Sequence, residues 1–358
     1  MSTALQRLPR LRWAAILGTA LAVLALTVCS LELRLARQGF QPNLSDSVAL
    51  WARQRQRADR LGSRALLLVG DSRVLTDLDL GELRRISGLE PVQLGVGEAS
   101  FLPVLQDLAK DPKVSGTLLV NFEPQELHPV GDDPAAAYEA QYHPSRAGYD
   151  WDFADMEATL TDELHVHLRS YADGARPLTS LLMRASGPPA RSQYITVLPD
   201  REELADFSLV KEPALYYVRA IRDFPTWPVP PEHATLEEVQ ATIEYALVTL
   251  RPADPLAYRS QYSHLAGLVA AIGRHAGRVV FVRLPRCGYL QLIDDRRFPR
   301  RSFWDPLQDL PGVQTLNFED VPALVAFRCP DGSHLDKGDK TAFTRSLADA
   351  LQLGDGRR

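Results

Sequence analysis

Apolar residues are concentrated most strongly near the N-terminus of the chain. From Trp13 to Leu31 no side chain carries a charge, and this stretch matches the roughly 20 apolar residues that a membrane-spanning helix needs. Arg7, Arg10 and Arg12 precede it, so the positive-inside rule places the N-terminus in the cytoplasm. The pattern predicts a single-pass anchor in the cell inner membrane through residues 13–31, with a periplasmic or extracellular body.

A cleaved signal peptide is the alternative interpretation of the same segment. The apolar region of a signal peptide usually spans only ~7–15 residues, which is shorter than this stretch. No small-x-small cleavage motif follows Leu31. Both observations favour an anchor that stays attached to the body.

Beyond the anchor, short apolar runs alternate with helical patterns. A continuous apolar run that ends in glycine or a polar residue is typical of a strand buried in a parallel sheet. Helical periodicity separates several of these runs, for example at Leu102–Lys110 and Tyr262–His275. Strands that alternate with helices predict an α/β domain with a parallel sheet. The predicted strands are Ala65–Gly70, Pro91–Gly95, Gly116–Asn121, Arg278–Leu284 and Val313–Phe318.

The same patterning divides the chain into four parts. Residues 1–35 hold a cytoplasmic tip and the anchor, and residues 36–60 are polar and helix-compatible, which predicts a linker helix. The α/β domain is expected over residues 61–128 and 259–358. The intervening residues 129–258 are rich in proline and aromatic residues, with a clear helix at Leu236–Leu250. Because long irregular connections are usually functional, this segment is expected to be an insertion or cap.

Composition excludes several classes of protein. Apolar residues make up 45% and charged residues 24% of the 358 residues, as in an ordinary globular protein. The chain holds 40 lysines and arginines against 45 aspartates and glutamates, a net charge of −5. Residues 1–35 hold four arginines against one glutamate, so the remaining chain is still more acidic, with 36 basic and 44 acidic residues and a net charge of −8. Such a body has no electrostatic footprint for a phosphate backbone, and no nucleic-acid partner is expected.

The first predicted strand is followed by Gly70-Asp71-Ser72-Arg73. Ligand sites of open α/β sheets lie at the carboxyl ends of the strands, which is where Ser72 falls. A serine that begins a helix is well placed as a nucleophile, because the free N–H groups of the first turn favour developing negative charge. Asp and Ser are also preferred helix N-caps, so this motif alone also fits a purely structural role.

The far end of the chain supplies the partners that a nucleophilic serine needs. Asp331 and His334 lie three residues apart just before the last helical pattern. This spacing lets the aspartate hold one nitrogen of the imidazole while the other nitrogen faces a serine. A neutral imidazole can accept the serine proton near neutral pH. A turn residue and an exposed capping residue are the structural alternatives for Asp331 and His334.

These blocks together resemble the SGNH/GDSL hydrolase superfamily over about residues 62–128 and 260–355. The resemblance implies a flavodoxin-like three-layer α/β/α sandwich with Ser72 as nucleophile, His334 as base and Asp331 as its orienting partner. It also implies an oxyanion hole made by the backbone of Ser72, the backbone N–H of Gly97 and the side-chain amide of Asn121. The chain departs from the family pattern directly after two of these residues, at Arg73 and Phe122.

Two of the three cysteines are placed beside the predicted site. Cys29 lies in the apolar helix, Cys287 follows the strand Arg278–Leu284, and Cys329 directly precedes the Asp-x-x-His block. Cys287 and Cys329 are therefore both expected at the carboxyl edge of the sheet. In an oxidising compartment they are predicted to form a disulfide, and two packed thiols are the alternative.

Two further segments have a possible role in binding. The basic and aromatic run Arg296–Trp304 is a candidate for holding a sugar or polyanionic substrate, although a solvated, salt-bridged loop is the commoner structure for such a run. His165 and His167 would share a face if they lay on a strand. Their surroundings lack the ligand spacing of known metal sites, so no metal and no other cofactor is expected.

The sequence thus predicts a membrane-anchored serine acyl-ester hydrolase or O-acyltransferase. By resemblance, the substrate is an acylated glycan or other ester, such as the O-acyl groups of a cell-surface or exported polysaccharide, and a membrane acyltransferase is a possible partner. A catalytically silent member that binds glycan or scaffolds such an acyltransferase is the alternative. A membrane-tethered lipid esterase is a third hypothesis, and the order of the triad residues does not separate hydrolysis from transfer.

Overall fold

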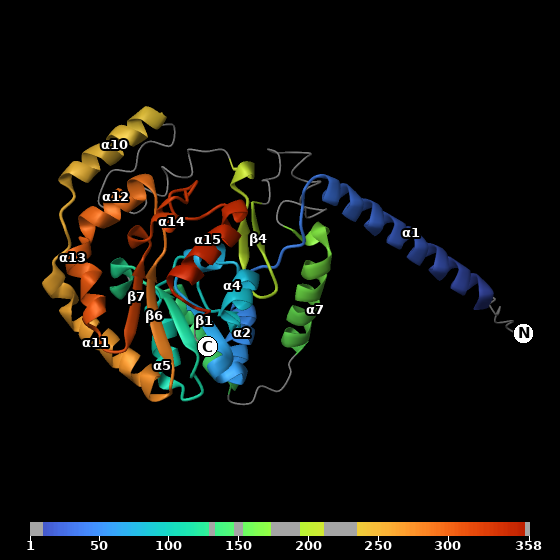
Figure 1. Cartoon of the computed structure of the whole chain (residues 1–358). Helices are drawn as coiled ribbons and strands as arrows, with labels where there is room; N and C mark the ends of the chain where they lie inside the picture. Colours follow the sequence, from blue (N-terminus) through green and yellow to red (C-terminus); the bar gives the residue numbers. More distant parts are fainter. Residues whose placement is uncertain (1–9, 129–132, 147–152, 173–193, 211–234, 355–358) are drawn as a thin grey trace, which may run out of the picture. The chain divides into compact units, whose positions relative to one another are not determined.

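The computed structural model describes residues 10–128, 133–146, 153–172, 194–210 and 235–354 (Figure 1). The chain divides into two compact units. The first comprises residues 1–44 and 153–196, and the second comprises residues 45–152 and 197–358. These limits differ from the expected ones, because the first unit combines the anchor with part of the predicted insertion.

One long helix, α1 (Arg10–Arg37), dominates the first unit. From Trp13 it is long and apolar enough to cross a membrane, and the 18-residue apolar window within it is not buried in the protein. The helix continues beyond the apolar stretch. There the Glu32 carboxylate accepts the backbone N–H groups of Arg169 and Ser170 at 2.8 and 2.9 Å, which caps the short helix η3 (Arg169–Tyr171). The helix α7 (Phe153–His167) precedes it.

A five-stranded sheet forms the centre of the second unit. Its order is β2-β1-β3-β6-β7, and all four neighbouring pairs are parallel. Each central strand is a continuous apolar run because both of its faces are covered. The parallel sheet predicted from the sequence is therefore confirmed. The strands are β1 (Ala65–Val69), β2 (Glu90–Gln93), β3 (Thr117–Asn121), β6 (Arg278–Arg283) and β7 (Val313–Asn317).

Helices cover both faces of this sheet. Alternate residues of β1 enter different cores, since Leu67 and Val69 pack on one face and Leu66 and Leu68 on the other. The first core is closed by α2 (Val48–Leu61), α5 (Leu102–Lys110), α6 (Pro134–Arg146) and α11 (Pro255–Arg274). The second is closed by α4 (Leu80–Ser87), α14 (Pro322–Val325) and α15 (Lys337–Ala350).

The remaining elements are short or lie outside the main sheet. The helices are α3 (Ser72–Thr76), α10 (Leu236–Thr249), α12 (Gly288–Arg297) and α13 (Arg300–Phe303). The strands are β4 (Ile195–Val197) and β5 (Glu203–Ala205). Single 3₁₀ turns are η1 (Gly62–Arg64), η2 (Pro124–Leu127), η4 (Phe207–Leu209), η5 (Asp305–Asp309) and η6 (Phe318–Asp320).

The helix within the segment expected to be a linker, α2, is instead part of the α/β core. Within residues 36–60, α2 buries the side chain of Trp51 completely. Two tyrosines of α6 pack edge-to-face on this indole, Tyr138 at 6.1 Å and Tyr142 at 6.0 Å between ring centroids. Because α6 lies within residues 129–258, part of the predicted insertion also completes this core.

A buried ion cluster fixes α2 to α5. The Arg55 side chain has no solvent exposure, and its guanidinium contacts Asp107 at 2.6 Å and Asp111 at 2.9 Å as well as Asp59. A buried guanidinium is tolerated only when its donors are paired. The cluster therefore stabilises the packing of these helices as long as it stays complete.

Replacing Arg55 by alanine is expected to destabilise the protein by about 3–5 kcal/mol, since it strands buried carboxylates. Arg60→Ala, an exposed change on the same helix, should alter stability by less than about 0.5 kcal/mol. Urea unfolding of the detergent-solubilised chain, followed by tryptophan fluorescence, measures both changes. Equal effects of the two substitutions would show that the buried cluster does not stabilise this packing.

Candidate active site

A sharp turn at the carboxyl end of β1 presents Ser72. Gly70 has a φ of +148°, and an added Cβ there would lie 2.8 Å from the Cβ of Asn121, so only glycine fits. Asp71 then caps α3, because its carboxylate accepts the backbone N–H of Arg73 at 3.0 Å. The turn and the cap together place Ser72 as the first residue of α3.

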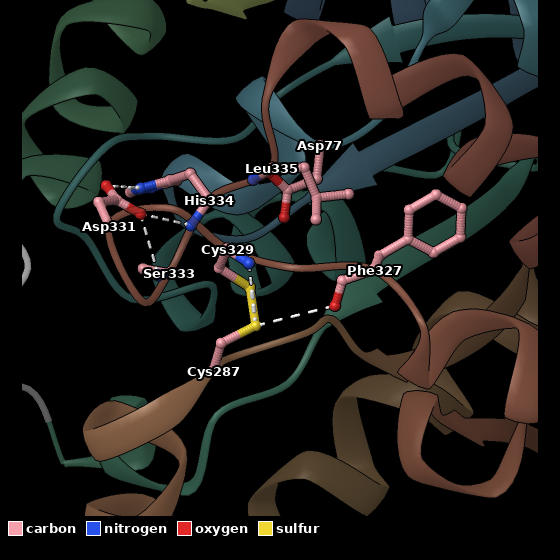
Figure 2. The surroundings of a disulfide bond; sticks show 8 residues. All are labelled: Asp77, Cys287, Phe327, Cys329, Asp331, Ser333, His334 and Leu335. Atoms are coloured by element: carbon pink, nitrogen blue, oxygen red, sulfur yellow. Dashed lines mark hydrogen bonds and ion pairs between the residues drawn. A yellow bond between two sulfur atoms is a disulfide. The ribbon is translucent and has the colours of Figure 1, made fainter. Parts of the chain in front are cut away.

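The loop between α14 and α15 presents His334. Oδ1 of Asp331 accepts the backbone N–H groups of Ser333 at 3.0 Å and of His334 at 2.8 Å. Oδ2 of Asp331 lies 2.8 Å from Nδ1 of the imidazole (Figure 2). The side chain of Asp331 is fully buried. The three-residue spacing thus lets one carboxylate fix both the turn and the orientation of the ring.

These two segments meet across the carboxyl edge of the sheet. Oγ of Ser72 lies 2.7 Å from Nε2 of His334, although 262 residues separate them in sequence. The structure therefore brings together all three residues proposed as a triad, in the order hydroxyl, imidazole, carboxylate. In this arrangement His334 can accept the serine proton while Asp331 holds the ring as a donor at Nδ1.

The residues expected to form the oxyanion hole surround the same turn. The amide of Asn121 donates to Asp71 at 3.2 Å and its Oδ1 accepts the N–H of Leu284 at 3.1 Å. Contacts at both ends of the amide fix the orientation of the Asn121 side chain. On the neighbouring loop, an added Cβ on Gly97 would meet no atom within 4 Å, so the space beside this residue is open.

Loop geometry keeps Gly97 next to the Ser72 turn. The backbone N–H of Val96 donates to the carbonyl of Gly70 at 2.9 Å. Glu98, directly after Gly97, has a φ of 58°, which is uncommon for a residue with a side chain. The loop is therefore held against the end of β1 in a specific conformation.

A buried charge network beside the nucleophile was not predicted. Arg73, 1% exposed, contacts Asp71 at 2.8 Å and Glu123 at 2.6 Å. Burial opposes ionisation of Asp71, but the adjacent guanidinium outweighs it and holds the pKa of that carboxyl below its usual value. Burial and the charges of Asp71 and Glu123 raise the pKa of Glu126. The sequence signal for this network was Arg73 itself, where the chain departs from the pattern that its motifs resemble.

The two cysteines lie where the sequence placed them. The structure joins Cys287 and Cys329 by a disulfide, with their Cα atoms 5.6 Å apart (Figure 2). The backbone N–H of Cys287 also donates to the carbonyl of Gly332 at 3.0 Å. Both links tie the loop that carries Asp331 and His334 to the start of α12.

The aromatic side chains of the basic and aromatic run are part of the packed interior. Phe298, Phe303 and Trp304 are at most 5% exposed, so their faces are not available to stack on a sugar. Arg300 pairs with Asp320 at 2.7 Å and with Asp305 at 3.3 Å. Arg300 therefore fits the commoner alternative, a salt-bridged surface loop, better than a role in binding substrate.

The strand geometry considered for the histidine pair is wrong. His165 and His167 lie at the end of the helix α7, where residues two apart do not share a face. His167 instead lies 3.5 Å from Glu163 one turn earlier. Among the residues that the structure describes, no group of three or more His, Cys, Asp or Glu side chains is arranged to hold a metal ion.

Comparison of the chain with models of protein families and with curated proteins finds no match. The chemistry of the site therefore rests on the residues and distances given above.

Replacing Cys287 and Cys329 together by alanine is expected to lower stability by about 2–4 kcal/mol, because the disulfide closes a long loop of the unfolded chain. Thermal unfolding measures the change, and Cys29→Ala is the matched control. Mass spectrometry after alkylation of the unfolded, unreduced wild type should find only Cys29 modified. Alkylation of all three cysteines would contradict the disulfide.

Proposed function

We propose that this protein is a membrane-anchored serine acyl-ester hydrolase or O-acyltransferase. The observation that carries the proposal is the continuous hydrogen-bonded relay from Oγ of Ser72 through His334 to Asp331, at 2.7 and 2.8 Å. A hydroxyl, an imidazole and a buried carboxylate in this order form an activated nucleophile.

The reaction begins with attack of Ser72 Oγ on an acyl carbonyl carbon. His334 takes the hydroxyl proton at Nε2 and Asp331 stabilises the resulting imidazolium. The tetrahedral oxyanion is stabilised by N–H donors from Ser72, Gly97 and Asn121, and one such donor is typically worth about 3–4 kcal/mol. Collapse expels the alcohol, which receives the proton from His334, and leaves an acyl-serine.

The second half of the cycle decides between hydrolysis and transfer. His334 removes a proton from the incoming hydroxyl, which attacks the acyl-serine and restores Ser72. Water releases a free acid, whereas a sugar hydroxyl yields a new ester. Both outcomes use the same three residues.

The fold supports the resemblance to the SGNH/GDSL superfamily. The strand order β2-β1-β3-β6-β7 corresponds to the 2-1-3-4-5 order of flavodoxin-like sheets, whose ligand site lies at the carboxyl end of the switch point between the first and third strands. Ser72 follows the first of these strands and Asn121 ends the third. This agreement supports a flavodoxin-like sandwich with the site in the expected place.

The proposed location is the cell inner membrane, with the N-terminus in the cytoplasm and the body in the periplasm. Its support is the apolar helix α1, the arginines before it and a disulfide in the body, which is typical of an oxidising compartment. An esterase or acyltransferase held there would meet O-acylated polysaccharide at the cell surface or during export. A membrane acyltransferase is the protein partner that this proposal implies.

Ser72→Ala is expected to lower kcat/KM for p-nitrophenyl acetate by at least about 10³-fold, because the nucleophile is lost. Ser263→Ala, an exposed serine on α11, is the matched control and should behave as wild type. A fluorophosphonate should label the wild type and the control but not Ser72→Ala. Unlabelled wild type with no Ser72-dependent turnover would instead support a catalytically silent, glycan-binding or scaffolding protein.

Membrane topology is tested with proteinase K added to spheroplasts. The body after α1 is expected to be digested, and an epitope at the N-terminus should stay protected, because the arginines keep that end inside. The full-length chain should also remain in the pellet after carbonate extraction. Protection of the body, or its release as a soluble species, would contradict the proposed anchor.

A further inference from the structure

A buried carboxyl that the triad does not use lies directly behind the site. Asp77 follows the last residue of α3, and its side chain is fully buried. Oδ1 accepts the backbone N–H of Leu335 at 3.0 Å (Figure 2). Among the residues that the structure describes, the other carboxyl oxygen is buried without a hydrogen-bond partner. Burial of an under-paired carboxyl costs stability, so its presence calls for a role.

Asp77 connects the two segments that carry the nucleophile and the base. On one side it binds the amide of Leu335, the residue directly after His334. On the other side the hydroxyl of Thr76 lies 2.9 Å from Oδ1 of Asp77 and 2.9 Å from the carbonyl oxygen of Ser72. The carboxylate therefore contacts the backbone of the residue after His334 directly. It reaches the backbone of Ser72 through the Thr76 hydroxyl, whose single proton is donated to one of the two acceptors at a time.

Further contacts hold the same end of α3 against α15. Thr344 donates to the backbone carbonyl of Asp77 at 3.5 Å, and the ammonium of Lys340 donates to the carbonyl of Leu75 at 3.3 Å. The backbone around Asp77 is therefore fixed independently of its carboxyl group. Loss of the carboxyl should free the loop beyond His334 without detaching α3.

The electrostatics of this position favour an ionised carboxylate near neutral pH. Burial raises the pKa of Asp77 to about 6, while the charge of His334, the N–H of Leu335, the hydroxyl of Thr76 and the charge of Arg73 all favour its ionised form. Lys340 of α15 is the nearby lysine: burial lowers its pKa, and the charge of Glu202, with which it pairs at 3.0 Å, and then that of Asp77 oppose this effect. Near neutral pH, a negative charge thus lies behind the loop that carries His334.

We propose that Asp77 is a positioning residue of this site: its carboxylate holds the Leu335 amide, and through it the imidazole of His334, at hydrogen-bonding distance from Ser72. The proposal rests on the proposed serine-esterase function. Its negative charge also favours the imidazolium that forms when His334 takes the serine proton. Asp331 orients the ring from its Nδ1 side, and Asp77 fixes the backbone on which the ring is mounted.

The test compares Asp77→Asn, Asp77→Ala and the control Asp107→Ala in the full-length, detergent-solubilised protein, with p-nitrophenyl acetate as substrate. Asparagine keeps an oxygen that accepts the Leu335 N–H but removes the charge, whereas alanine removes both. Small displacements of a reacting group cost up to about 10²-fold in rate. We expect kcat to fall about 10-fold for asparagine and about 100-fold for alanine, with KM changed less than about 3-fold in each.

Asp107→Ala removes another buried carboxyl, on α5, which pairs with Arg55. It should lower the unfolding temperature but leave kcat within about 2-fold of wild type below that temperature. The rate of fluorophosphonate labelling at Ser72 should follow the same ranking as kcat. If Asp77→Ala has a wild-type kcat, or if Asp107→Ala loses as much, Asp77 has no positioning role.

The pH profile separates positioning from a general loss of stability. Asp77 must lose a proton before its full negative charge faces the loop of His334, so log kcat/KM of the wild type should bend downward near pH 6, where burial places the pKa of Asp77. The other buried carboxyl that interacts with His334 is Glu203 of β5, whose pKa burial raises to about 7; it is present in every variant, so its titration is common to all profiles. In Asp77→Asn the slope of the acid side should become shallower because the bend near pH 6 is lost. An unchanged slope would overturn the electrostatic part of the proposal, and this variant decides the question even if Asp77→Ala does not fold. Absence of any Ser72-dependent turnover in the wild type would refute the proposed function itself.

Discussion

The hydrogen bond between Ser72 and His334 is the contact on which the rest of the account depends. It joins residues 262 positions apart, at 2.7 Å, and neither partner could reach the other without the parallel sheet. Because every strand of such a sheet points the same way, the segments that follow β1 and β7 emerge at one edge. Local backbone structure then brings the two side chains together. The turn at Gly70 and the helix cap at Asp71 position Ser72, and the hydrogen bonds of Asp331 hold the turn that positions His334.

Buried charge is the main cost of this arrangement. Arg73, Asp77 and Asp331 are all at most 1% exposed, and each would be unfavourable alone. Arg73 is neutralised by Asp71 and Glu123, and Asp331 is saturated by the imidazole and two backbone N–H groups. Asp77 is the exception, with one oxygen unpaired among the described residues. A polar group that stays under-paired beside the Ser72–His334 pair is consistent with the proposal that this site is kept for its function at a cost in stability.

Much of the fold follows from local patterns, and the parts that do not have specific physical causes. The buried strands were predictable because a strand covered on both faces must be a continuous apolar run. The packing of α2 in the core could not be predicted from its polar sequence. Arg55 is buried only because it pairs with Asp107 and Asp111, which lie far away in sequence. The alternation around His165 fits a strand, yet that segment folds as a helix.

Ser72 could be predicted because it directly follows a buried strand of a parallel sheet. Asp331 and His334 could be predicted because a separation of three residues lets the carboxylate reach the imidazole. Asp77 could not, because an aspartate after a short helix looks like an ordinary cap.

The central claim is that the Ser72 hydroxyl is made nucleophilic by His334 and carries the acyl group during turnover. Quenched-flow mass spectrometry with p-nitrophenyl acetate tests it most directly. In the wild type, an acetyl group should accumulate on the peptide that contains Ser72 within the first turnover. In His334→Ala, the acetylated peptide should form far more slowly. Turnover without an acylated Ser72 peptide, or acylation that is as fast without His334, would contradict the account.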